Sequence, residues 1–179
     1  GFNGLAPLWS EAGTYQPLPP PWDSYDFDHA HVKRAYTNYC IAAVEFFDPD
    51  YLAIDMEANI LLAASPSKWE AYKDLQDHVY TTLKTLYPDL TVCSTIQHEY
   101  LLGLHYLAEQ LRDQYAGSYP DILTDQVHEL MKHSDLVAIS TFPYMVLSNT
   151  VGEDYYEPAY RIAEKLGIPV AVDQTGYIS

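Results

Sequence analysis

The chain has 179 residues, of which 48% are hydrophobic and 14% aromatic. That is enough for one domain with a sizeable core and too apolar for a disordered chain. Nine basic residues face 25 acidic ones, giving a formal net charge of −16. This balance argues against a nucleic-acid partner, whose phosphates need Lys and Arg, and against binding to an anionic membrane.

The two cysteines indicate free thiols and not a disulfide. Cys40 falls in a predicted helix and Cys93 in a predicted strand, so both are expected to be buried, and the redox compartment stays undecided. No apolar run is long enough to cross a membrane, and the first residues do not form a signal-peptide pattern.

Short apolar runs alternate with helical periodicity along the whole chain. The runs predict five strands, a weak one at 5–9 and others at 51–57, 90–96, 135–141 and 168–174. Helical crossovers between strands build a parallel sheet, so the fold class is α/β. We expect a single domain over 1–179, and the strand count fits an open sheet as well as part of an eight-stranded barrel.

The helices are predicted from apolar spacing and from their end signals. After a Pro-rich loop at 10–28, one helix is expected from Asp28 to Phe47. A second opens at Ser65-Pro66 and carries Trp69, in the core, and Leu86 on its apolar stripe. The remaining helices are expected before Gly117, around 127–131, and before a C-terminal cap at Gly167.

Two strand endings carry the chemistry. The segment 51–59 passes from an apolar run into Glu57, and the segment 169–177 passes into Gln174. In α/β folds, functional groups collect at the carboxyl ends of strands, and two facing carboxylates there perform glycoside hydrolysis. Glu57 is therefore a candidate proton donor, with a plain surface-loop glutamate as the alternative.

The segments 51–59, 65–70, 141–144 and 170–177 resemble the clan A glycoside hydrolases, the (β/α)8 barrels that include many cellulases, mannanases and galactanases. In that clan the acid/base Glu ends strand four and the nucleophile Glu ends strand seven. The resemblance implies these roles for Glu57 and for position 174, which also end strands three apart. It further implies an incomplete TIM-type barrel covering about strands three to seven.

Three departures from the clan pattern concern the same strand ends. Gln174 is an amide, which cannot act as a covalent nucleophile, and its neighbour Asp173 is expected to point to the other side of the strand. Met56 stands where the clan commonly has Asn before the acid/base, and Asn59 is a candidate to compensate. Asp55 shares a strand face with Glu57, so it needs a partner if that face is buried.

Five further residues are candidates for substrate binding. The hydroxyl of Tyr144 could hold Gln174, and His98 and Glu99, at the end of a strand, could contact sugar hydroxyls. Trp9 and Trp22 are candidates for stacking on pyranose rings, because an aromatic face is flat and apolar. Packing or loop roles remain the alternatives for each of them.

No cofactor or metal is predicted. His29 and His31 lack further ligands, and the sequence has no Gly-rich phosphate loop, no nucleophile elbow and no paired Cys-x-x-Cys motif.

The leading hypothesis is a retaining glycoside hydrolase module acting on a β-linked polysaccharide or oligosaccharide, impaired at Gln174. The alternative is a non-catalytic carbohydrate-binding or scaffold protein on the same fold. A third interpretation is a fragment that self-associates or pairs with the missing barrel strands. The substrate class suggests a secreted or periplasmic setting.

Overall fold

The computed structural model describes residues 19–104, 119–145 and 151–176 of the chain. It is a mixed α/β structure whose strands are all parallel to their partners. The predicted strand at 5–9, the predicted helix before Gly117 and the first part of the Pro-rich loop lie outside the described residues.

The strands form two small sheets. Strands β1 (Tyr51–Ala53) and β2 (Thr91–Cys93) make one sheet, and β3 (Thr95–Gln97), β4 (Val137–Thr141) and β5 (Val170–Thr175) make the other, in that order. The predicted parallel α/β class is therefore confirmed. Among the described residues these sheets stay open, and no closed barrel is formed.

The predicted strand at 90–96 is split into β2 and β3 at Ser94. Backbone N–H groups that would extend a ladder donate to side chains here. The N–H of Ser94 donates to Ser134 Oγ at 3.1 Å, and that of Thr95 donates to Asp55 Oδ1 at 2.7 Å. These bonds explain why the pairing with β1 ends at Cys93.

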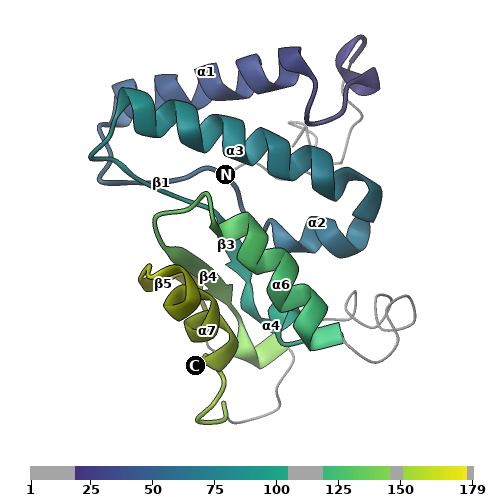
Figure 1. Cartoon of the computed structure of the whole chain (residues 1–179), viewed down its shortest axis with the longest axis vertical. Coiled ribbons are helices and arrows are strands. Elements are labelled where there is room, and N and C mark those ends of the chain that lie inside the picture. Colours follow the sequence, from purple (N-terminus) through teal and green to yellow (C-terminus); the bar gives the residue numbers. More distant parts are fainter. Residues whose placement is uncertain (1–18, 105–118, 146–150, 177–179) are drawn as a thin grey trace.

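Helices pack against the strands. They are α1 (Ala30–Phe47), α2 (Asn59–Ala64), α3 (Trp69–Leu86), α4 (His98–Leu101), α6 (Tyr119–Met131) and α7 (Glu157–Leu166), with 3-10 turns η1 (Trp22–Ser24), η2 (Pro66–Lys68) and η3 (Pro143–Met145). Figure 1 shows α1 and α3 side by side, and α6 and α7 in front of β3, β4 and β5. The short helices α2 and α4 were not predicted.

Local signals account for some of the helix ends. The side chain of His29 caps α1 by accepting the N–H of His31 at 3.2 Å. Gly167 ends α7 with φ 70, a left-handed conformation that glycine adopts at little cost, as predicted. The helix predicted to open at Ser65-Pro66 begins differently. The side chain of Ser65 makes no cap bond, and the segment starts as the 3-10 turn η2 before α3.

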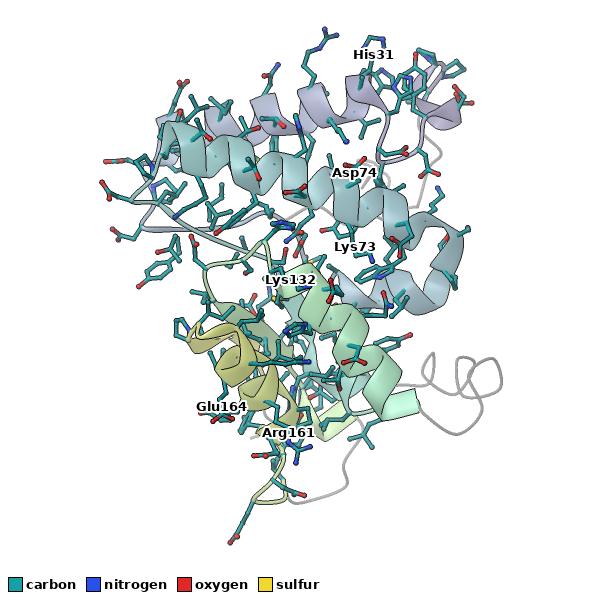
Figure 2. The ribbon with its side chains drawn as sticks, viewed as in Figure 1. His31, Lys73, Asp74, Lys132, Arg161 and Glu164 are labelled. Atoms are coloured by element: carbon teal, nitrogen blue, oxygen red, sulfur yellow. The ribbon has the colours of Figure 1, made fainter. Side chains whose placement is uncertain are left out.

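Two apolar clusters hold the helices against the strands. The larger packs α2, α3, α6 and α7 against β3 and β4, and the smaller packs α1 and α3 against β2. Trp69 is buried as predicted, whereas Leu86 at the end of α3 is exposed. Lys33 of α1 also binds Asp74 of α3 at 2.6 Å, and Asp74 is labelled in Figure 2.

Both cysteines are buried and free, which confirms the expectation drawn from their positions. Burial raises the pKa of Cys40 to about 11 and that of Cys93 to about 12, so both are protonated thiols near neutral pH. None of the described helices is both long and apolar enough to cross a membrane.

Candidate functional site

Glu57 occupies a tight junction between β1 and α2. Its φ of 52 lies in the left-handed region, which is unusual for a residue with a side chain. Two bonds to Thr95 hold this conformation: the N–H of Glu57 donates to Thr95 Oγ1 at 2.8 Å, and the N–H of Ala58 donates to the Thr95 carbonyl at 2.9 Å. The backbone of this partly buried residue is thus fixed by the neighbouring strand.

Ser140 holds the carboxyl group of Glu57. Its hydroxyl donates to Glu57 Oε1 at 2.6 Å, and it is the residue of β4 that pairs with Gln174 of β5. Paired residues in neighbouring parallel strands point to the same face of a sheet. Ser140 therefore links the two candidate positions, because it contacts Glu57 directly and lies beside Gln174.

The end of β5 departs from regular alternation. Val172 pairs with Ile139 and Gln174 pairs with Ser140, so Asp173 is left as a bulge. Ala171 packs with Cys93 and Ala138, and Asp173 follows two residues later on that same face. The expectation that Asp173 and Gln174 point to opposite sides assumed an uninterrupted strand and is corrected here: pairing and alternation place both on the face of Ser140.

Electrostatics support this placement of Asp173. Burial is the main cause of the raised pKa values of Asp55 and Cys93, and the charge of Asp173 adds to both shifts. Cys93 packs with Ala138 and Ala171 on that face. Partial burial also raises the pKa of Asp173 itself. The side chains of Asp173 and Gln174 nevertheless remain exposed, so solvent and ligands reach them.

Asp55 has the partners that a buried carboxylate requires. It accepts bonds from the N–H of Thr95 at 2.7 Å and from the hydroxyl of Tyr72. It is 2% exposed, and burial raises its pKa to about 6 despite these bonds. Asp55 thus orders the junction before Glu57 and is not open to a ligand.

A second polar cluster lies around Glu99, which is completely buried. Its carboxylate accepts bonds from Gln97 Nε2 at 2.6 Å, Thr141 Oγ1 at 2.8 Å, the N–H of Phe142 at 2.6 Å and the hydroxyl of Tyr155 at 2.5 Å. Burial, together with the bond to Glu99, raises the pKa of Tyr155. With four donors, Glu99 joins the ends of β3 and β4 to the segment before α7.

Asn59 and His98 are fully enclosed by protein, in contrast to the sugar contacts expected of them. Asn59 donates to the carbonyl of Gln97 at 3.0 Å and accepts its N–H at 2.8 Å. His98 Nε2 bonds to the carbonyl of Tyr155 at 2.7 Å, and burial lowers the pKa of His98. Both side chains therefore bind backbone groups of the protein and support the site without being accessible to a sugar.

The expected aromatic contacts are partly accessible. Tyr144 is 42% exposed, and its ring lies beside Gly176, where an added Cβ would meet Tyr144 Cε1 at 3.3 Å. That position is just beyond Gln174, although no bond between Tyr144 and Gln174 is seen. Trp22 in η1 is half-buried and packs edge-on against Tyr25 at 5.8 Å, while Trp9 lies outside the described residues.

Sequence reasoning missed Thr95 and Ser140 as organisers of the site, and it offered Glu99 only as a contact for sugar hydroxyls, whereas Glu99 is fully buried. A signal for Ser140 was present, because it is a polar residue at the end of an apolar strand, where Glu57 had been noticed for the same reason. Thr95 had no comparable signal, and the signal at Glu99 did not indicate its role, since both roles depend on contacts with distant segments.

Within the described ranges no group of three or more His, Cys, Asp or Glu side chains is arranged to hold a metal ion. In comparisons with known proteins, the chain matches no family model, no curated protein and no solved structure.

Proposed function

We propose that the chain is a glycoside hydrolase-like module of the retaining (β/α)-barrel type that acts on β-linked polysaccharides or oligosaccharides. Glu57 is the acid/base, and position 174 is the nucleophile position, which as an amide does not form a covalent intermediate. The site residues and the parallel strand order support this role.

The observation that carries the proposal is the link through Ser140. Its hydroxyl lies 2.6 Å from Glu57 Oε1, and its strand partner is Gln174. Neighbouring strands are about 4.8 Å apart. A carboxyl group at position 174 is therefore expected on the order of 5 Å from that of Glu57, which is the spacing of a retaining glycosidase.

The substitution Gln174→Glu tests this function. We expect turnover of unsubstituted β-glycans by Gln174→Glu that the parent does not show, because the variant regains a nucleophile. Adding Glu57→Gln to the variant is expected to lower its kcat by about 100-fold or more, since the general acid is lost. Reducing-sugar release over a broad β-glycan panel is the measurement, and no turnover by Gln174→Glu on any member would refute the proposal.

A second candidate function is favoured by Gln174 itself, since the amide removes the nucleophile and leaves the polar surface. It is carbohydrate binding without hydrolysis on the same fold. Oligosaccharide binding that survives Glu57→Gln, measured by calorimetry, with no turnover by Gln174→Glu, would select this function over the first.

A further inference from the structure

The surroundings of Gln174 are those of a working site even though the nucleophile is absent. Ser140 still fixes Glu57, and Thr95 still fixes the backbone of Glu57 in a left-handed conformation. Such conformations are costly and persist where the surrounding contacts enforce them. A glycosidase without a protein nucleophile can still act when its substrate supplies one, as substrate-assisted glycosidases do.

The bulge in β5 places two different acceptors next to each other. Gln174 presents a neutral amide with a carbonyl oxygen, and Asp173 presents a carboxyl group on the same face. Both side chains are exposed, so neither is consumed by internal packing. An amide oxygen accepts an N–H from a ligand, and a carboxylate stabilises positive charge that develops beside it.

Aromatic rings border this pair of acceptors. The rings of Phe142 and Tyr144 lie against Gly176, where an added Cβ would meet them at 3.4 Å and 3.3 Å. The two rings pack edge to face with centroids 6.3 Å apart. They offer an apolar wall for a small methyl group two residues beyond Gln174.

We propose that the site acts on 2-acetamido-2-deoxy-β-glycosides and that the acetamido oxygen of the substrate is the nucleophile. Gln174 accepts the acetamido N–H, Asp173 faces the charge that develops on that nitrogen, and the rings beside Gly176 receive the methyl group. The inference rests on the proposed function, because it uses Glu57 as the proton donor.

The reaction balances without a further reactant. Glu57 gives its proton to the glycosidic oxygen as the C1–O bond breaks, and the acetamido oxygen bonds to C1, forming an oxazolinium ring. Water then attacks C1 and gives a proton to the Glu57 carboxylate, while the C1–oxygen bond of the ring breaks and the acetamide is restored. In the β-gluco series the acetamido group and the leaving group lie on opposite faces of the sugar, so the net result is hydrolysis with retention.

A matched pair of substrates tests the inference in the parent chain. We expect hydrolysis of 4-nitrophenyl 2-acetamido-2-deoxy-β-glucoside, with kcat/KM at least about 100-fold above that for 4-nitrophenyl β-glucoside, because only the first carries the nucleophile. Asp173→Asn and Gln174→Ala are each expected to lower that kcat/KM by about 10-fold or more. Glu164→Gln, on the outer side of α7, is the matched control and leaves it unchanged.

A binding measurement gives a readout that does not depend on turnover. The thiazoline derived from N-acetylglucosamine mimics the oxazolinium ring, and calorimetry is expected to show that the parent binds it and that Gln174→Ala weakens it by about 10-fold or more. A parent that neither binds the thiazoline nor prefers the acetamido substrate overturns the inference. If Gln174→Glu then hydrolyses unsubstituted β-glycans, the proposed function stands alone, and if it does not, both are wrong.

Discussion

Asp55 is a buried carboxyl group whose ionisation is strongly affected by folding. Its carboxyl group is enclosed, with Tyr72 and Thr95 as hydrogen-bond donors and Asp173 as a nearby like charge. Burial raises its pKa from 3.8 to about 6, so the folded chain binds this proton more tightly than the unfolded chain does. The protonated form of Asp55 therefore stabilises the folded state. This contribution to the free energy of unfolding is fully present below pH 4 and is lost as the pH rises through about 6.

The variant Asp55→Asn tests this dependence. Asparagine stays neutral and can still accept the N–H of Thr95, so the pH-dependent loss is expected to disappear. The difference in unfolding free energy between the variant and the parent should shift in favour of the variant by about 2–3 kcal/mol between pH 4 and pH 7. Urea unfolding at several pH values measures this, and a difference that does not change with pH would contradict the assigned shift.

Strand and helix ends in this chain are held together by side chains and not only by backbone ladders. Glu99 connects the end of β3 to the end of β4 and, through Tyr155, to the segment before α7. The side-chain amide of Gln97 cannot rotate to present its oxygen to a residue that replaces Glu99, because Gln97 Oε1 already accepts the N–H of Tyr100 at 2.5 Å. A side chain that replaces Glu99 must therefore accept hydrogen bonds from all four donors that now bond to its carboxylate.

We expect Glu99→Gln to destabilise the fold by about 2–5 kcal/mol, because one N–H of the new amide must face another donor in a buried site. Glu164→Gln, at an exposed position of α7, is the matched control and should change stability by less than about 0.5 kcal/mol. Urea midpoints of the two variants measure this. Equal midpoints would show that the cluster around Glu99 is open to water in solution.

The elements that could be predicted from sequence are those with a local signal. Four of the predicted strands are apolar runs between helical stretches, and Gly167 marks a helix end by its own conformation. The break at Ser94 and the helix α2 depend on distant partners instead, since the N–H of Thr95 donates to Asp55 and Asn59 is bonded to Gln97. The helix α4 has a local cap, the side chain of Gln97, but glutamine is not among the usual N-cap residues.

The candidate site divides in the same way. Glu57 and Gln174 could be found because polar residues after apolar strands are visible in the sequence. The bulge at Asp173 could not, because it exists only in the pairing between β4 and β5. One unpaired residue was enough to reverse the expected direction of a carboxylate, which is why strand alternation alone misplaced it.

At the scale of the whole molecule, two features have opposite effects on self-association: exposed apolar surface favours it, and a large negative charge disfavours it. Within the described residues β1 pairs only with β2 and β5 only with β4, so one edge of each strand is open to further pairing. Large apolar side chains gather where α1 and α3 end and β1 begins, at the same end of the molecule in Figure 1. They are Phe46, Phe47, Tyr51 and Leu86, each more than half exposed.

These features predict self-association that is controlled by salt. The formal charge of −16 repels like copies, and at about 0.15 M salt the Debye length of roughly 8 Å screens that repulsion. The double substitution of Phe46 and Phe47 by Ser removes two of the four exposed apolar side chains at this end of the molecule. It should weaken association, because burial of apolar surface drives association. Replacing the exposed Tyr160 of α7 by Ser is the matched control and should leave association unchanged.

Light scattering over a series of protein and salt concentrations measures this prediction. We expect the weight-average mass of the parent to rise with both, and that of the Phe46 and Phe47 double variant to stay lower at every salt concentration. Salt weakens the repulsion between like-charged copies, and the double substitution weakens the apolar attraction between them. The two changes therefore measure the two opposing contributions to association separately. A parent that stays a monodisperse monomer at high salt would mean that neither the open strand edges nor the apolar end is available for association.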